Sequence, residues 1–177
     1  MAFPKRYAEV VQRLRVPAGF VVGSGFVVLA RPSPASLAVG GSIALLGLGL
    51  RAWATGHLVK DQELAISGPF AHLRNPLYVG TLLVGAGFAV AGAHPTIGLL
   101  LVLFLALFYL PAIEEEERHL RQLFPDYAQY ASRVHKFWPS WRPGHASSRR
   151  FRFATYKRNR EYQAVAGFLV VMGLLAV

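Results

Sequence analysis

Apolar residues are gathered in five long stretches, and polar segments of unequal length separate them. The stretches cover residues 17–30, 35–53, 77–91, 95–113 and 162–177. A helix that crosses a bilayer needs roughly 20 apolar residues, with about 17 as the lower limit. The second and fourth stretches meet this limit, whereas the others must use flanking residues or thin the bilayer locally. The pattern predicts an all-α, multi-pass transmembrane helical bundle of about five spans.

The polar segments differ in a way that predicts an orientation. Residues 31–34 and 92–94 are tight turns, so the first and second stretches form one helical hairpin and the third and fourth form another. The opposite side, with Arg51 at its membrane edge, holds every one of the 19 Lys and Arg residues except Arg31, and all nine acids. Because positively charged loops stay inside the cell, we expect this charged face to be cytoplasmic, with the C-terminus outside.

Composition supports a membrane protein. Charged residues make up 16% of the 177 residues, against about a quarter in soluble domains. The chain contains no cysteine, which excludes disulfides, thiolate zinc sites and cysteine nucleophiles. The net charge of +10 lies between apolar stretches, which indicates an anionic lipid bilayer as partner rather than nucleic acid. We expect a single integral membrane domain over residues 1–177.

An alternative interpretation treats residues 1–30 as a cleaved signal peptide. The arm is basic, the apolar core is short, and the run Val28, Leu29, Ala30 is similar to a cleavage site. Its removal would break the first hairpin.

Glycine is dense in the second and third stretches. Small residues allow close packing of membrane helices, and we expect most of these glycines to serve that purpose. They are Gly40, Gly41, Gly47 and Gly49 in the second stretch and Gly80, Gly85 and Gly87 in the third.

The segment before the third stretch contains the first candidate site. Gly68 and Pro69 predict a turn. Asn75 is placed to cap the third helix, and Pro76 to occupy its first position. Local structure therefore accounts for these residues without any chemistry.

Arg74 is not explained by local structure. It stands at the N-terminus of the third helix, where free backbone N–H groups, the helix dipole and a guanidinium together favour an anion. A ligand's carboxylate or phosphate would suit this place. Tyr78 lies one turn inside the helix, and Gly80 would let a ligand approach the backbone.

The second candidate site is the acidic run that continues the fourth stretch out of the membrane. A solvated face is the simple interpretation, with Glu114–Arg118 and Glu117–Arg121 as i,i+4 pairs. However, successive helical residues point about 100° apart, so at least one of four consecutive acids must face the bundle. A carboxylate there would suit a cationic or hydroxyl-bearing ligand.

Other polar groups carry weaker signals. His57 follows the second stretch as an interfacial histidine, and the six histidines are scattered without metal-ligand spacing, so we expect no metal. Residues 141–161 are basic and aromatic, which predicts an interfacial segment on the membrane surface. A lid over a site that opens to the bilayer is the alternative for this segment.

Two motifs stand in order on either side of a predicted hairpin. The first is Gly68, Pro69, Phe70, then Arg74, Asn75, Pro76, Leu77, Tyr78, Val79 and Gly80; the second is Glu116, Glu117, then Leu120, Phe124, Tyr127 and Tyr130. Together they resemble motifs of the isoprenylcysteine carboxyl methyltransferase family and of the related phospholipid methyltransferases. Upstream, Trp53, Gly56, His57 and Lys60 resemble bacterial members. The resemblance covers residues 35–140, with the basic segment and a C-terminal transmembrane helix, 162–177, outside it.

The resemblance implies S-adenosyl-L-methionine-dependent methyl transfer at the cytoplasmic helix ends. Carried over, it assigns a cofactor pocket lined by Arg74, Asn75, Pro76, Tyr78 and Gly80, joined by His57, Gly68, Pro69 and Phe70, and closed by Glu116 and Glu117. Arg74 and Glu117 would bind and orient the reactants. In-line methyl transfer needs positioning and a desolvated site more than acid–base groups, so no residue is assigned a proton transfer.

Two departures from the family pattern leave the methyl acceptor open. Asn75 replaces a histidine, and the C-terminal part lies outside the shared core. A lipophilic or small-molecule carboxylate, thiol or amine is therefore expected, and a prenylated cysteine only if the host makes one. Two other hypotheses remain: a membrane reductase, in which Arg118, Arg121 and Arg133 would bind the 2′-phosphate of NADPH, and a non-catalytic scaffold or partner subunit.

Overall fold

The computed structural model of the chain describes residues 5–143 and 149–176. Within them every regular element is helical, which confirms the predicted all-α class. The apolar helices are α1 (Lys5–Leu29), α2 (Pro34–Thr55), α3 (Pro76–Gly92), α4 (Pro95–Phe104) and α8 (Tyr162–Leu175). They correspond to the five apolar stretches of the sequence.

Two helices in the described part of the chain are long and apolar enough to cross a membrane. One is α2, and the other is the continuous helix Pro95–Leu123, in which α4, the π-helical turn η2 (Leu105–Tyr109) and α5 (Leu110–Leu123) follow one another. The apolar parts of α1, α3 and α8 are shorter.

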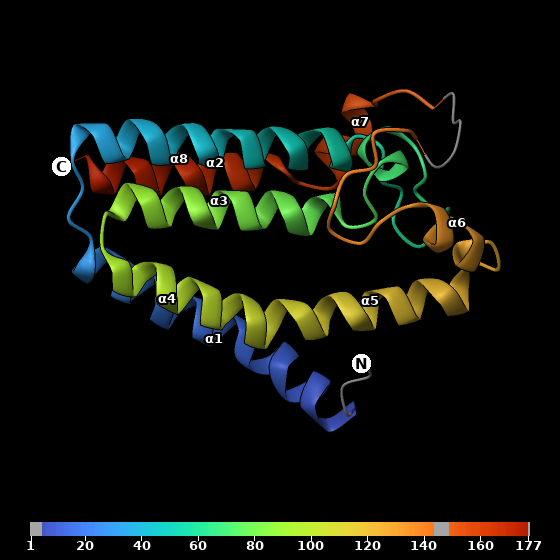
Figure 1. Cartoon of the computed structure of the whole chain (residues 1–177), viewed down its shortest axis with the longest axis horizontal. Helices are drawn as coiled ribbons and strands as arrows, with labels where there is room; N and C mark the ends of the chain where they lie inside the picture. Colours follow the sequence, from blue (N-terminus) through green and yellow to red (C-terminus); the bar gives the residue numbers. More distant parts are fainter. Residues whose placement is uncertain (1–4, 144–148, 177) are drawn as a thin grey trace.

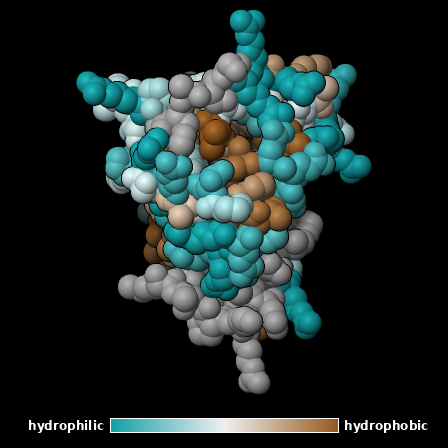
Figure 2. Space-filling view, turned by 90° about the vertical axis from the view of Figure 1, so that its right-hand side faces the viewer, coloured by the Kyte–Doolittle hydropathy of each residue, from teal (hydrophilic) through white to brown (hydrophobic). Residues whose placement is uncertain are grey.

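The short elements gather at one end of the bundle (Figure 1). They are η1 (Gly68–Ala71), α6 (Tyr127–Arg133) and α7 (Phe153–Arg158). Viewed toward this end, the surface is mostly hydrophilic, and hydrophobic residues are visible inside a hollow (Figure 2). The polar groups of the chain are therefore concentrated at one end, as the sequence predicts.

The connections at the opposite end are short, and side chains cap the helices there. Ser33 Oγ accepts a hydrogen bond from Ser36 N at 3.1 Å, and Ser36 Oγ accepts one from Ser33 N at 2.8 Å, so α2 begins with a reciprocal capping box. His94 caps α4 through Thr96 N. The two predicted tight turns are thus confirmed.

The packing partners of the helices are only partly those that the turns indicate. One layer contains α2, α3 and α8, and the other contains α1 with α4 and α5 (Figure 1). The most extensive contact joins α2 to α3, and α1 packs against α4 and α5 rather than against α2. The first predicted hairpin therefore opens across the layers, whereas α3 keeps a contact with α4, as the second predicted hairpin requires.

Glycines explain why α2 and α3 approach so closely. A Cβ atom added to Gly40 would lie 2.4 Å from Gly87 O, and one added to Gly47 would lie 2.6 Å from Gly80 O. Real Cβ contacts are never this short, so the two backbones touch only because these positions lack side chains. The predicted packing role holds for these four glycines, whereas a Cβ on Gly49 would meet nothing within 4 Å.

The outer faces of the bundle are apolar. Val28 on α1, Leu46 on α2 and Leu169 on α8 are 83%, 70% and 62% exposed. The inner face of α8 packs through Phe168 against Ala44 and Leu48 of α2. Large exposed apolar faces on helices of this length indicate contact with lipid, so the protein is membrane-associated.

We expect Gly87→Ala to destabilise the protein, because its methyl group would press on the backbone of α2. Overpacking of this kind costs about 1–3 kcal/mol, only partly offset by a gain of about 1 kcal/mol in helix propensity. The measurement is thermal unfolding of the detergent-purified chain. Gly49→Ala is the matched control, since it gains the propensity without a clash. A Gly87→Ala variant at least as stable as Gly49→Ala would contradict the close-contact account.

Candidate active site

The two sequence motifs meet at the charged end of the bundle. Asn75, just before α3, donates a hydrogen bond from Nδ2 to Glu117 Oε1 on α5 at 3.2 Å. Arg74 places a terminal guanidinium nitrogen 3.8 Å from the same oxygen. Asn75 occupies the N-cap position of α3, but its side chain makes no capping bond, because it is used to reach Glu117. The prediction that Asn75 caps α3 is therefore right for its position and wrong for its side chain.

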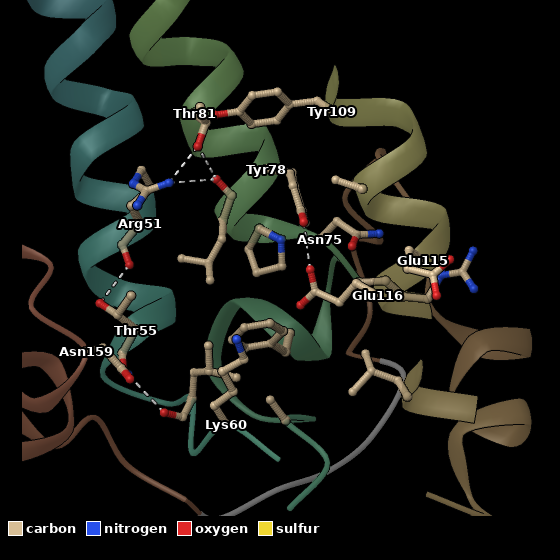
Figure 3. Close-up of a pocket in the computed structure, with 18 of the residues that line it drawn as sticks. Arg51, Thr55, Lys60, Asn75, Tyr78, Thr81, Tyr109, Glu115, Glu116 and Asn159 are labelled. Carbon is tan, nitrogen blue, oxygen red and sulfur yellow. Dashed lines mark hydrogen bonds between the residues drawn. The ribbon is translucent and has the colours of Figure 1, made fainter. Parts of the chain in front are cut away.

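A second contact joins the motifs one turn further along. Tyr78 on α3 donates its hydroxyl hydrogen to Glu116 Oε2 at 2.8 Å (Figure 3). Its ring packs edge-on against Tyr109, with centroids 5.8 Å apart. Glu116 and Glu117 therefore both face α3, each through a different partner.

The π-helical turn accounts for the placement of Tyr109. It ends two residues before Pro111, which lacks an N–H and cannot continue an ordinary helical ladder. The wider turn absorbs this interruption, so the long helix runs on from α4 into α5. Turns of this type are frequent at functional sites.

Lys136 completes the charge network from outside the two motifs. Its ammonium nitrogen lies 2.6 Å from Glu114 Oε1 and 3.5 Å from Glu117 Oε2. Its backbone carbonyl accepts a hydrogen bond from Asn75 Nδ2 at 3.3 Å. The segment that follows α6 thus returns to brace the start of α3.

This network corrects the predicted i,i+4 ion pairs. Arg118 pairs with Glu115 at 2.6 Å rather than with Glu114. Glu117 faces Arg74 and Lys136 rather than Arg121. A charge removed from water needs a nearby partner. Glu117 finds this partner in Arg74 and Lys136, which are distant in the sequence but lie close to it in space, and not in Arg121 on its own helix.

A large cleft of about 1450 Å³ separates the two layers and reaches the charged end. Of the predicted site residues, six line it and five do not. Those on its wall are Phe70, Arg74, Asn75, Pro76, Tyr78 and Glu116. Those away from it are His57, Gly68, Pro69, Gly80 and Glu117.

His57 and Gly68 form a buried structural contact behind the cleft. The imidazole hydrogen-bonds through Nδ1 with Ser67 Oγ at 2.9 Å. Gly68 has a φ of +58°, and a Cβ there would lie 2.6 Å from the His57 ring, so glycine fits for both reasons. Burial lowers the pKa of His57, and the nearby Arg149 charge lowers it further. A neutral imidazole in this place suits packing better than ligand binding.

Gly80 receives a protein side chain rather than a ligand. The aliphatic part of Arg51 covers it, and a Cβ there would lie 2.5 Å from Arg51 Cγ. The Arg51 guanidinium then donates to Thr81 Oγ1 at 2.6 Å and to both carboxylate oxygens of Glu161, at 2.6 and 3.0 Å. Arg51 and Thr81 line the cleft (Figure 3), and so does Glu161.

Two buried tyrosines form the floor beneath Arg74. Tyr130 donates its hydroxyl hydrogen to Phe70 O at 2.8 Å, and burial raises the pKa of its phenol. Burial, with the Glu117 charge, raises the pKa of Tyr127 to about 12. Both phenols therefore stay protonated at neutral pH. Within this setting Arg74 Nε is buried and makes no hydrogen bond to the described residues.

Comparison with known proteins identifies the group to which this architecture belongs. The sequence model of the phospholipid methyltransferase family matches residues 37–127, which contain most of α2, the helices from α3 to α5, the first motif and the second motif as far as Tyr127. The chain belongs to the phospholipid methyltransferase family. Members of this family are membrane methyltransferases. The predicted resemblance to phospholipid methyltransferases is therefore confirmed as family membership.

Two curated relatives share part of the chain. The cobalt-zinc-cadmium resistance protein CzcN of Cupriavidus metallidurans is 35% identical over 57% of this chain and 46% of its own length. The nickel-cobalt-cadmium resistance protein NccN of Alcaligenes xylosoxydans xylosoxydans is 34% identical over 45% of this chain and 38% of its own length. The chain therefore spans less than half of each relative. No solved structure matches it significantly.

Sequence reasoning missed four polar residues at the phospholipid methyltransferase-like site. Lys136 braces Glu117, and Arg51, Thr81 and Glu161 form the polar wall near α8. Arg51 gave a signal, because it is a charged residue at the end of an apolar stretch. Its partner, Glu161, is 110 residues away and could not be identified from spacing.

We expect Glu117→Leu to lower the stability of the protein by about 2 kcal/mol or more, since it takes from Arg74 and Asn75 the carboxylate that they share in a largely buried place, although Lys136 keeps its pair with Glu114. Glu115→Leu removes a similar charge from the same helix, but its pair with Arg118 is partly exposed, so the expected cost is below about 1 kcal/mol. Thermal unfolding of both variants measures the difference. Equal effects would show that Glu117 is no more than a surface charge.

Proposed function

We propose that the chain is an S-adenosyl-L-methionine-dependent methyltransferase that acts on a lipophilic or small-molecule acceptor with a carboxylate, thiol or amine. One observation carries this proposal. Arg74, with a buried Nε that makes no hydrogen bond to any residue that the structure describes, stands on the wall of the main cleft beside two glutamates that other groups hold in place. Family membership supports methyl transfer in general.

The polar groups of the cleft fit the cofactor. It carries a carboxylate, an ammonium and a ribose diol, and it supplies a methyl group bonded to a positively charged sulfur. Arg74 and the start of α3 suit the carboxylate. Glu116 suits the ammonium or the diol, since its carboxylate lies on the cleft wall and already accepts from Tyr78. Glu117 would act from behind, by fixing Arg74 and Asn75.

The size of the cleft supports two ligands. Pockets for one small molecule usually hold about 300–1000 Å³, and this cleft exceeds that range at about 1450 Å³. Its polar part is lined by the residues around Arg74. Its other part runs between the layers and is lined by apolar or small groups of the membrane helices, Gly19, Gly23, Val27, Leu77 and Phe104. We place the cofactor in the first part and the acceptor in the second.

The protein would promote the reaction by positioning and by excluding water. Tyr78 and Tyr109 stand edge-on where the two parts of the cleft meet, and both line it. Held by Glu116, Tyr78 would fix how closely the two ligands approach. The apolar walls between the layers would desolvate the reacting groups.

The reductase hypothesis gains no support from the geometry. Arg118 pairs with Glu115, Arg121 lies over the Tyr127 ring at 5.3 Å, and Arg133 is exposed. Among the residues that line the cleft, none of these three appears. The groups expected to bind a 2′-phosphate therefore point elsewhere.

The names of the two relatives concern resistance to metal ions, which makes direct metal binding a second candidate function. The described residues contain no group of three or more His, Cys, Asp and Glu side chains that could hold a metal ion. His119 and Asp61 approach to 3.3 Å, but two ligands make an incomplete site. The geometry therefore favours methyl transfer over direct metal binding.

The binding experiment is calorimetry of the detergent-purified protein with S-adenosylmethionine, S-adenosylhomocysteine and NADPH. We expect saturable binding of the first two and none of NADPH. Arg74→Ala should abolish binding, because it removes the cation that lacks a full set of partners. Arg118→Ala is the control, since it removes an arginine that lies outside the cleft.

The outcomes separate the hypotheses. Binding of NADPH alone would assign the protein to the reductases. No binding of any of the three by a folded protein would favour a non-catalytic scaffold. Normal affinity in Arg74→Ala would overturn the site assignment while leaving the cofactor in place.

We also propose that all five apolar helices cross the membrane, with the charged end in the cytoplasm. The absence of native cysteines allows a direct test by single substitutions. Ser132→Cys on α6 and Ser33→Cys before α2 are both exposed and lie toward opposite ends of the bundle. An impermeant maleimide added to intact cells should label Ser33→Cys only. Labelling of Ser132→Cys alone would reverse the orientation, and labelling of both would contradict the spanning arrangement.

A further inference from the structure

A second, smaller hollow lies at the charged end, away from the predicted site residues. It has a volume of about 300 Å³, and three arginines, Arg149, Arg152 and Arg158, line it together with Glu63 and Thr155. Three guanidinium groups against one carboxylate give the hollow a net positive charge. A concave, positively charged site of this kind selects an anion.

The arginines in the hollow are not equally engaged. Arg149 forms an ion pair with Glu63. The side chains of Arg152 and Arg158 make no ion pair or hydrogen bond with the described residues, and both are exposed. The guanidinium groups of Arg152 and Arg158 can therefore bind an anion. Each group is planar and can donate two parallel hydrogen bonds to the oxygens of a phosphate.

Backbone contacts fix this hollow to the end of α2. Arg152 donates its backbone N–H to Gly56 O at 3.1 Å. Asn159 donates from Nδ2 to Thr55 O at 2.9 Å and to Leu58 O at 3.0 Å. Arg152, just before α7, and Arg158, its last residue, are thus held beside the last turn of α2, so the hollow is built into the fold.

The position along the bundle indicates the source of the anion. α8 begins at Tyr162, four residues after Arg158, and packs against α2. Both helices carry exposed apolar side chains, among them Leu46, Leu169 and Val170. Helix α7 lies where α2 and α8 reach the polar end of the bundle (Figure 1). The hollow, which Arg158 of α7 lines, therefore lies near the ends of two helices with exposed apolar faces, at the expected depth of lipid headgroups.

We propose that this hollow binds the phosphate of an anionic phospholipid, with Arg152 and Arg158 as its main ligands and the acyl chains along the outer face of α2 and α8. The inference rests on the proposed membrane placement and not on methyl transfer. Basic pockets between membrane helices on the cytoplasmic side are suited to such headgroups.

The test is native mass spectrometry of the full detergent-purified chain with added phosphatidylglycerol, phosphatidylcholine or inorganic phosphate. We expect saturable binding of phosphatidylglycerol. The double variant Arg152→Gln with Arg158→Gln should bind it roughly tenfold more weakly, since it loses two charge-assisted contacts. The matched control is Arg133→Gln with Arg142→Gln, which removes the same charge from exposed positions outside both hollows and should bind as the unmodified protein does.

Four results would overturn the inference. Equal affinity of the Arg152/Arg158 variant and the unmodified protein would exclude these arginines as ligands. Equal losses in both double variants would indicate attraction by net charge alone. Displacement of the lipid by inorganic phosphate at similar concentration, or equal binding of phosphatidylcholine, would show that the site does not select an anionic lipid. A normal S-adenosylmethionine affinity in the same samples would keep any such failure separate from the proposed methyl transfer.

Discussion

The close approach of α2 and α3 is the constraint on which the rest of the molecule depends. It exists because Gly40 and Gly47 face Gly87 and Gly80 with no side chains between the backbones. Since these two helices make their main contact with each other, the helices joined to them by short turns, α1 and α4, are left to pack together in a second layer. The main cleft lies between the two layers. The glycine packing of α2 against α3 therefore leaves room for ligands between the layers.

The close contact between α2 and α3 also positions the polar groups of the site. Gly80 leaves room for the stem of Arg51, whose guanidinium then reaches Thr81 and Glu161. One turn earlier, the start of α3 presents Arg74 and Asn75 to α5. Burying several charges together is costly unless each has a partner, and the carboxylates of α5 and the ammonium of Lys136 meet that need. Among the described residues, Arg74 Nε is a buried donor without a hydrogen-bond partner, which makes Arg74 the member of the network with most to gain from an anionic ligand.

The sequence predicted much of this arrangement, and its failures have identifiable causes. Hydropathy and charge located the helices and the polar end, and the order of the motifs predicted that Glu116 and Glu117 would meet the start of α3. Spacing along one helix wrongly paired Glu117 with Arg121, because it cannot anticipate that Lys136 returns from a distant loop. His57 and Gly80 stand in or near the motifs but serve packing, since a motif records which residues recur together and not which face of a helix they occupy.

The C-terminal third of the chain completes a site that the family core leaves open. The family match ends at residue 127, yet Lys136, Asn159 and Glu161 all contribute to the cleft or to its bracing. Glu161 in particular neutralises Arg51 beside the part of the cleft assigned to the acceptor. A lone arginine there would attract carboxylates, whereas the paired group presents a nearly neutral polar wall. Under the proposed function, the acceptor would meet a wall that a segment outside the family match completes, whereas the groups proposed to hold the cofactor, Arg74 and Glu116, lie within the match.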